Sequence, residues 1–262
     1  MTDGKRGGSD LGVRTISGIA LIALALTALW AGGIWFWLLT SIAAMLMLSE
    51  WGDLVQSDPK HKRLTLFAGC VPLAIMAPGL AAGPSFLALG LTIGAAFFIV
   101  IVTNKPRLAF GIVYVALPTL ALLLLRGQPQ GLLLATWTLA TVWATDIGAY
   151  AAGRSIGGPK LAPSVSPNKT WAGLIGGVIA ALLLGLALWR LADLRLQFAV
   201  ASAILAVISQ IGDLYESWLK RLAGVKDSGS LLPGHGGVLD RLDGLVPVAP
   251  AAAALILVDR FL

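Results

Sequence analysis

Long apolar runs, separated by short polar segments, divide this chain of 262 residues and restrict its fold more than any other feature. About 20 mostly apolar residues suffice for one helix to cross the hydrocarbon core of a bilayer. Nine runs approach that length, at 13–31, 34–50, 64–81, 85–103, 108–125, 131–152, 171–191, 196–219 and 245–260. The pattern predicts an all-α integral membrane protein with about nine transmembrane helices.

Composition agrees with a membrane protein. Only 12% of the residues are charged, whereas a soluble domain contains roughly 25%. The net charge of +6 does not indicate a nucleic-acid partner, because the basic residues lie in short loops and not on one polar face. The single cysteine, Cys70, lies in an apolar run, so we expect a buried free thiol and no disulfide within the chain. Residues 1–10 show no cleavage pattern of a signal peptide, so we expect the first run to be retained as a helix.

The distribution of Lys and Arg predicts the orientation in the membrane. If the N-terminus is inside, 15 of the 19 basic residues lie in inside segments, and the outside segments carry only Arg126, Arg190, Arg195 and Arg260. Cytoplasmic loops are enriched in Lys and Arg, so we expect the N-terminus inside and, after nine spans, the C-terminus outside. The polar segments 153–170 and 220–244 then face the cytoplasm, where nucleotides are. No soluble domain fits between the runs, so we divide the chain into N-terminal membrane helices (1–125) and a C-terminal membrane core (126–262).

The segment 217–244 is polar and rich in glycine, although it lies between apolar runs. Basic side chains bind phosphates, and carboxylates bind a hard cation such as Mg²⁺. A loop at membrane depth is tolerated where protein covers it or where it lines a polar cavity, so we predict a polar active-site cavity that faces the cytoplasm. His235 has no second histidine or cysteine nearby, which argues against zinc. The charged residues and His235 of this segment are Lys220, Arg221, Lys226, Asp227, His235, Asp240, Arg241 and Asp243.

The acidic residues Asp146, Asp213 and Glu216 lie within the expected helices. A bare carboxylate in hydrocarbon costs about 2.5 kcal/mol or more, so such residues usually face a cavity and have partners. Ser217 and Lys220 share one helical face with Asp213 and Glu216, and Tyr150 lies one turn after Asp146. The alternative is that these acids sit at helix ends and reach the headgroup layer.

The segment before the run 171–191 contains Ser166, Asn168, Lys169 and Thr170. Free N–H groups at a helix start bind phosphate, and Lys169 adds a positive charge. The alternative is a helix cap beside an ordinary cytoplasmic lysine. The spacing is not that of a Walker A loop. No Ser or Cys is paired with a base as an activated nucleophile, which favours direct displacement between bound substrates.

Several motifs together resemble the signature of the phosphatidate cytidylyltransferase (CDP-diacylglycerol synthase) family. The resemblance is strong in the second half of the chain, whereas the first half agrees only in consisting of membrane helices. The motifs are Asp146-Ile-Gly-Ala-Tyr150, Ser166-Pro-Asn-Lys-Thr-Trp171, Gln210-Ile-Gly-Asp-Leu-Tyr-Glu-Ser217, Ser217-Trp-Leu-Lys-Arg221, Lys226-Asp-Ser-Gly229, His235-Gly-Gly237 and Asp240-Arg-Leu-Asp243.

The resemblance implies that CTP and phosphatidic acid react to CDP-diacylglycerol and pyrophosphate with Mg²⁺, in phospholipid biosynthesis. It implies a metal centre at Asp213 and Asp240, with Asp146 and Asp243 as further ligands; the number of ions, and whether a monovalent cation joins Mg²⁺, stay open. Catalytic roles would fall on Asp213, Asp240, Lys220, Arg221, Lys226, Asp227, His235 and Arg241, with His235 positioning a phosphate or the glycine turn. Substrate-binding roles would fall on Ser166, Asn168, Lys169, Thr170, Tyr150, Glu216 and Ser217.

The resemblance also implies a homodimer, and we expect the inner membrane of a bacterium as the location. Two alternative functions stay open. A CTP-dependent kinase of a lipid alcohol would release CDP and not pyrophosphate, and the complete run 235–243 argues against it. A transporter would place polar groups at the midplane in paired repeats, and we find no such pairing.

Overall fold

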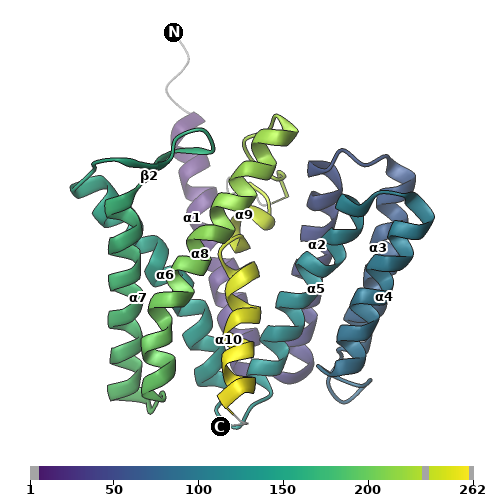
Figure 1. Cartoon of the computed structure of the whole chain (residues 1–262), viewed down its shortest axis with the longest axis horizontal. Helices are drawn as coiled ribbons and strands as arrows, with labels where there is room; N and C mark the ends of the chain where they lie inside the picture. Colours follow the sequence, from purple (N-terminus) through teal and green to yellow (C-terminus); the bar gives the residue numbers. More distant parts are fainter. Residues whose placement is uncertain (1–5, 232–235, 260–262) are drawn as a thin grey trace.

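The computed structural model describes residues 6–231 and 236–259, and helices make up most of this part of the chain (Figure 1). Each of the nine predicted apolar runs coincides with one long helix in these residues. The long helices are α1 (Arg6–Ala31), α2 (Gly33–Leu54), α3 (Pro59–Ile75), α4 (Phe86–Thr103), α5 (Pro106–Arg126), α6 (Gly131–Ser155), α7 (Trp171–Ala192), α8 (Leu196–Ala223) and α10 (Leu245–Asp259). A short helix, α9 (Leu239–Leu242), precedes α10.

Six helices, α2 and α4 to α8, are long and apolar enough to cross a membrane. The apolar parts of α1 and α10 are shorter. Helix α3 has 17 residues and a basic first turn, which begins after the N-cap residue Asp58. The protein is therefore a helical integral membrane protein, and nine crossings stay a prediction.

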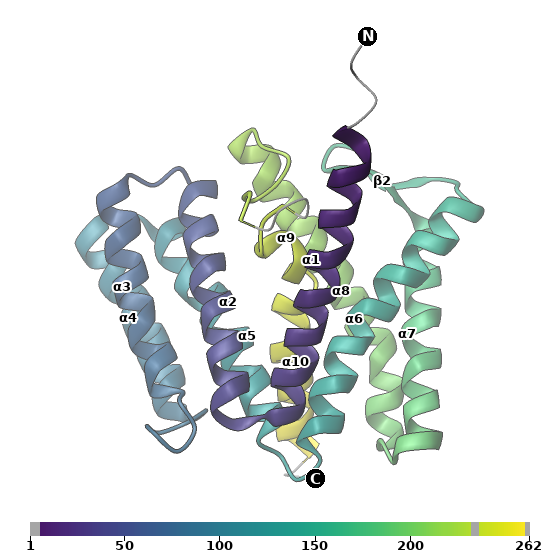
Figure 2. The same ribbon diagram turned by 180° about the vertical axis from the view of Figure 1, so that it is seen from behind.

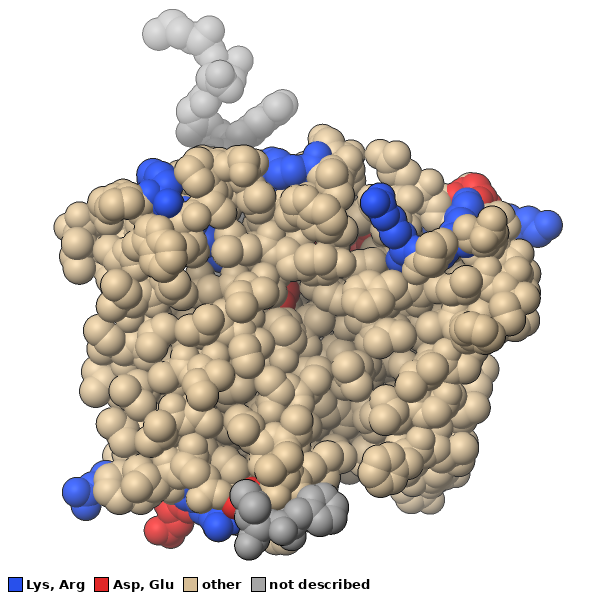
Figure 3. Space-filling model, in the orientation of Figure 1, with Lys and Arg blue, Asp and Glu red and all other residues tan. Residues whose placement is uncertain are grey.

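The helices lie side by side, and their connections gather at two opposite edges of the molecule (Figures 1 and 2). The start of α1, the α6–α7 connection and the α8–α9 connection lie at the same edge. Blue and red side chains gather at the two edges, and an apolar band separates them (Figure 3). This arrangement places both long polar segments at one side of the apolar band, as the sequence predicts.

Small residues allow α6, α7 and α8 to approach one another closely. A Cβ atom on Gly148 of α6 would lie 2.6 Å from the backbone oxygen of Gly176 on α7. A Cβ atom on Gly185 of α7 would lie 2.5 Å from the backbone oxygen of Ala199 on α8. Such contacts are typical of membrane helices, where close van der Waals packing holds helices together. The packing fixes α8 relative to the connection between α6 and α7.

Two details differ from the prediction. The segment between α6 and α7 forms an antiparallel hairpin of β1 (Lys160–Ala162) and β2 (Ser166–Thr170), whereas the sequence pattern predicts an irregular loop in an all-α protein. The free thiol of Cys70 is exposed and not buried, because its side of α3 faces away from the helix bundle. Both differences leave the helical membrane fold unchanged.

Candidate active site

The two long polar segments, one between α6 and α7 and one between α8 and α10, meet at one end of α8. The predicted helical face is present there: Ser217 Oγ donates a hydrogen bond of 3.3 Å to Asp213 Oδ1, one turn away. Lys220 Nζ lies 3.2 Å from Oε1 of Glu216, whose side chain is fully buried. Apart from this ion pair, neither carboxylate oxygen of Glu216 has a hydrogen-bond partner among the described residues. This end of α8 therefore holds a buried acid beside a lysine.

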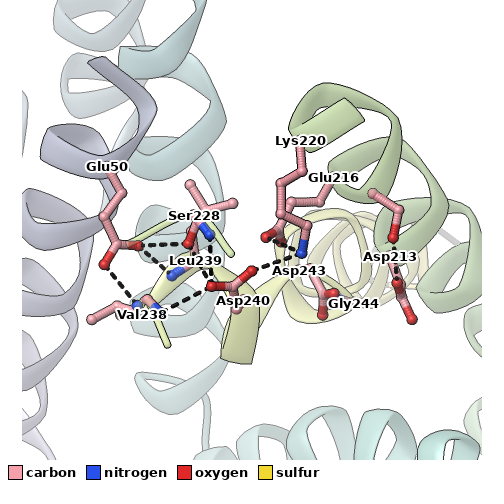
Figure 4. Close-up of polar contacts among 12 residues, drawn as sticks. Glu50, Asp213, Glu216, Lys220, Ser228, Val238, Leu239, Asp240, Asp243 and Gly244 are labelled. Carbon is pink, nitrogen blue, oxygen red and sulfur yellow. Dashed lines mark hydrogen bonds and ion pairs between the residues drawn. The ribbon is translucent and has the colours of Figure 1, made fainter. Parts of the chain in front are cut away.

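Asp240 on α9 connects Lys220 to the loop that precedes α9 (Figure 4). Its Oδ1 accepts a hydrogen bond of 2.7 Å from Lys220 Nζ. Its Oδ2 accepts hydrogen bonds from the backbone N–H groups of Ser228 (2.8 Å) and Gly237 (2.9 Å) and from Ser228 Oγ (2.9 Å). Burial alone would raise the pKa of Asp240, but these hydrogen bonds outweigh it and hold the pKa below its usual value. Asp240 is thus an ionised carboxylate, and both of its oxygens accept hydrogen bonds.

Glu50, near the end of α2, lies in the same network (Figure 4). Its side chain is buried, with only 2% exposed. Its Oε1 accepts a hydrogen bond from Val238 N–H at 2.9 Å, and its Oε2 accepts one from Leu239 N–H at 2.8 Å. Ser228 Oγ lies 3.1 Å from the same Oε2. Our sequence analysis did not identify Glu50. The sequence shows only that Glu50 is an acid at the end of the apolar run 34–50. Acids at the membrane–water interface commonly occupy such positions.

Lys169 lies at the end of the hairpin and contacts α8. Its Nζ lies 2.5 Å from Asp213 Oδ2, and both side chains are largely covered. Thr170 is the N-cap of α7, because its Oγ1 accepts a hydrogen bond of 3.0 Å from Gly173 N–H. The predicted helix cap is therefore present. Lys169, however, is not an ordinary solvated lysine, since it pairs with a carboxylate of a second predicted motif.

Asp243 follows α9 and lies close enough to Asp213 and Asp146 to feel their charges. Burial and the negative charges of Asp213 and Asp146 raise the pKa of Asp243 to about 7. Its Oδ1 accepts a hydrogen bond of 2.7 Å from Gly244 N–H. Figure 3 shows acidic side chains (red) recessed below the apolar surface of this face. Negative charge is therefore concentrated here, and a bound cation would relieve the repulsion.

The fit to Mg²⁺ can be judged from the oxygen donors. In the part of the chain that the structure describes, no three acidic, histidine or cysteine side chains come close enough to hold a metal by themselves. Mg²⁺ commonly uses only one or two carboxylates and completes its shell with water and substrate phosphates. Asp213, Asp146 and Asp243 supply carboxylates that influence one another, and a metal bound by one or two of them stays a prediction. The oxygens of Asp240 accept hydrogen bonds from Lys220, Ser228 and Gly237, and its role as a metal ligand stays a prediction.

The remaining residues that were predicted for the site are mostly exposed. Arg221 is exposed, and its Nε donates a hydrogen bond of 3.3 Å to the backbone oxygen of Val165 in the hairpin turn. The hydroxyl of Tyr150 accepts a hydrogen bond of 2.9 Å from Arg154. His235 lies outside the described residues. Among the other predicted residues, Ser166 is half-buried, and the side chains of Asn168, Lys226, Asp227 and Arg241 are exposed.

A groove of about 370 Å³ lies on the other side of α8. Aromatic side chains line it, among them Trp51, Phe110, Tyr215 and Trp218, and Arg107 provides a positive charge. Tyr215 and Trp218 occupy the side of α8 opposite to Asp213 and Lys220, given 3.6 residues per turn. The groove is therefore distinct from the predicted polar active-site cavity, which stays a prediction.

Comparisons with known proteins agree with this arrangement. A model of the Cytidylyltransferase family matches residues 12–259. The chain is 43% identical over 255 residues to a phosphatidate cytidylyltransferase of Brucella suis biovar 1 (strain 1330), covering 95% of this chain and 92% of the relative. It is 34% identical over 258 residues to that of Staphylococcus aureus (strain COL), covering 94% and 98%. It is 30% identical over 252 residues to that of Rickettsia bellii (strain RML369-C), covering 92% and 89%.

The family match extends over the helices, the hairpin and the loop that together form the site. All the motifs that the sequence analysis singled out therefore lie inside the one region that is similar to the family. The chain belongs to the cytidylyltransferase family and is a nucleotidyltransferase that uses CTP.

Proposed function

We propose that this protein is a phosphatidate cytidylyltransferase, which converts CTP and phosphatidic acid to CDP-diacylglycerol and pyrophosphate in phospholipid biosynthesis. The observation that carries the proposal is the convergence of two lysines and two aspartates at one end of α8. Lys169 pairs with Asp213, and Lys220 pairs with Asp240. These residues come from the hairpin, α8 and α9, so four motifs on three elements supply one site.

The chemistry is a direct displacement at the α-phosphorus of CTP. An oxygen of the lipid phosphate attacks this phosphorus, the new P–O bond forms, and the bond to the bridging oxygen of pyrophosphate breaks. The bonding electrons leave with pyrophosphate. Such transfers depend mostly on positioning and on stabilising negative charge. Lys169 would exchange its carboxylate partner for a phosphate oxygen as substrates bind, and Lys220 would bind phosphate while Asp240 keeps it in position.

We propose that Asp213, with Asp146 and Asp243 beside it, binds Mg²⁺. When bound, Mg²⁺ would neutralise negative charge on the nucleotide phosphates and on the leaving pyrophosphate. Asp240 would keep Lys220 at the edge of the same site. Arg221, Lys226 and Arg241 are exposed cations of the same polar segment, and they would suit the anionic headgroup of the lipid.

The proposed setting is the bacterial inner membrane, with the N-terminus and the site on the cytoplasmic side and nine crossings. Support comes from the common edge that both polar segments share with the start of α1 (Figures 1 and 2). The bacterial origin of the relatives agrees with this location. CTP and the inner-leaflet lipid would both reach the site from that side.

Tracing of the CTP phosphorus atoms tests the proposal against a lipid kinase. Purified protein in detergent would receive CTP labelled at either the α- or the γ-phosphorus, with phosphatidic acid or a lipid alcohol as acceptor, with and without Mg²⁺. The proposal expects lipid labelled from the α-position, with phosphatidic acid and Mg²⁺ only. Lipid labelled from the γ-position, with the alcohol as acceptor, would instead identify a kinase. The absence of Mg²⁺-dependent nucleotide binding would favour the transporter alternative.

A further inference from the structure

We propose that Glu50 is a positioning residue for this reaction: from the N-terminal half of the chain, it fixes the loop that carries Asp240. The inference rests on the proposed function, because its main readout is the rate of cytidylyl transfer. Its structural part, the anchoring of the loop by Glu50, can be measured without turnover.

The Glu50 carboxylate holds the loop before Asp240 by accepting hydrogen bonds from its backbone. Both of its oxygens accept backbone hydrogen bonds, from Val238 N–H at 2.9 Å and Leu239 N–H at 2.8 Å. Leu239 directly precedes Asp240 in the chain. A buried carboxylate that receives several N–H donors has a fixed orientation, and loss of one such acceptor leaves a buried donor unpaired. Glu50 therefore determines where the backbone before Asp240 lies.

Ser228 connects Glu50 and Asp240 directly. Its Oγ lies 3.1 Å from Glu50 Oε2 and 2.9 Å from Asp240 Oδ2. A hydroxyl has one hydrogen to donate, so at any moment it donates to only one of the two carboxylates that lie on either side of it. The backbone N–H of Ser228 also donates to Asp240, at 2.8 Å. Displacement of Glu50 would thus be transmitted to Asp240 through one shared residue.

The glycines of the loop make room for Glu50. A Cβ atom on Gly229 would lie 2.8 Å from Glu50 Oε1. A Cβ atom on Gly237 would lie 2.6 Å from Glu50 Oε2 and 2.1 Å from Ser228 Oγ. Real Cβ atoms do not approach carboxylate oxygens this closely, so glycine is required at both positions. At these two positions of the glycine-rich segment, a larger residue would therefore push the Glu50 carboxylate out of its hydrogen bonds.

Helix α2, which carries Glu50, packs firmly against α5. The neighbouring Trp51 is buried, and its Nε1 donates a hydrogen bond of 2.9 Å to the backbone oxygen of Arg107 at the start of α5. The Trp51 ring also packs against Phe110 and Tyr114 of α5, with centroid distances of 5.8 Å and 4.8 Å. A positioning residue on a well-packed helix places its partners more accurately than one on a loop. The first half of the chain thus contributes to the site through α2.

The consequence for the reaction follows from Asp240, which accepts a hydrogen bond from Lys220. If Glu50 no longer holds the loop, Asp240 and Lys220 lose their fixed separation and the phosphate-binding lysine is misplaced. The effect should fall on kcat more than on the KM for CTP, because Lys169 and the exposed cations are not anchored by Glu50.

The test compares Glu50→Gln and Glu50→Asp with Asp53→Asn. Asp53 lies one turn further along α2, has a 63% exposed side chain and pairs with Lys62, so its substitution controls for removal of an acid from this helix. Substitution of a residue that orients a ligand or catalytic group typically costs about 10-fold to 100-fold in activity. We expect a loss of that size in kcat for Glu50→Gln, little change in KM, and wild-type kinetics for Asp53→Asn. Amide exchange at Val238 and Leu239 should accelerate in Glu50→Gln.

A merely structural role would give a different result. If Glu50→Gln lowers the folded fraction or the melting temperature while kcat per folded molecule and exchange at Val238 and Leu239 stay at wild-type values, the proposal is overturned. If Glu50→Gln does not fold, Glu50→Asp provides the same readouts, because it keeps the charge and shortens the reach by one methylene. If wild-type protein forms no CDP-diacylglycerol, the proposed function fails, whereas the exchange experiment still decides whether Glu50 anchors the loop.

Discussion

Lys169 and Asp213 form an ion pair of 2.5 Å that joins the β-hairpin to α8. The pair links two motifs that lie far apart in the sequence, and both side chains are largely covered. In the proposed reaction each partner has a second task, since Lys169 would bind a phosphate and Asp213 a cation. The ion pair therefore keeps two reactive groups close together and charge-balanced until substrates bind.

Substitution of Lys169 tests its role in phosphate binding. A charge-assisted hydrogen bond contributes about 1.5–3 kcal/mol, so Lys169→Gln should lower kcat/KM for CTP by about 10-fold to 100-fold. Lys160→Gln is the matched control, because Lys160 lies on the same hairpin and is exposed. Steady-state kinetics at varied CTP would show the difference. Equal kinetics for both variants would contradict the role of Lys169.

Substitution of the two central aspartates tests the charge network. Asp213→Asn and Asp240→Asn should each lower kcat by about 100-fold or more, because cation binding and lysine positioning stabilise the transition state by several kcal/mol. Both variants should still elute as folded protein in size-exclusion chromatography, since asparagine preserves the shape of the side chain. If both retain wild-type turnover, these carboxylates have no part in the reaction.

Close packing of α6 against α7 should tolerate no larger side chain at Gly148. A Cβ atom there would lie 2.6 Å from the Gly176 backbone oxygen and 2.5 Å from the Ala180 Cβ. Overpacking costs typically about 1–3 kcal/mol, so Gly148→Val should lower the melting temperature in detergent. Gly90→Val provides the control, because a Cβ atom on Gly90 of α4 meets no atom within 4 Å. Equal melting temperatures would show that this helix contact does not limit stability.

Asp58 provides a pH-dependent contact at the edge of the bundle. The hydrogen bond from Lys105, at 2.5 Å, and the one from His61 N–H hold the pKa of Asp58 below its usual value. A carboxylate with a lowered pKa in the folded state stabilises the protein above its unfolded pKa of about 4, and this contribution is lost as the pH falls through the folded pKa.

Comparison of Asp58→Asn with wild type isolates this charge, since asparagine also caps a helix N-terminus. We expect wild type to melt at a slightly higher temperature at pH 7, and the difference to shrink as the pH is lowered below 4. The difference should be small because the pair is exposed to solvent. A difference that is independent of pH would contradict the role of the ionised carboxylate.

The helices could be predicted from the sequence because each apolar run is long enough to form one helix with its backbone fully paired. The polar face of α8 was also predictable, since Asp213, Ser217 and Lys220 recur at helical spacing. The hairpin over 160–170 was not, because its short strands carry polar residues without alternation. Its register depends on local pairing of Lys160 with Thr170 and of Ala162 with Ser166.

Glu50 could not be assigned from the sequence because its partners lie at Ser228, Val238 and Leu239, close to the other end of the chain. A single acid at the end of an apolar run fits the headgroup layer equally well. Only the packing of α2 against the loop shows that the acid is buried. In the same way, the spacing of the aspartates could not show that Asp240 pairs with Lys220 and Asp213 with Lys169.

The most direct test of the proposed reaction is the product stoichiometry of the purified wild-type protein with CTP, phosphatidic acid and Mg²⁺. Pyrophosphate and CDP-diacylglycerol would be measured in the same reaction as it proceeds. The account predicts that both appear at equal rates and that no CDP is released. Release of CDP with a phosphorylated lipid, or formation of neither product, would contradict it.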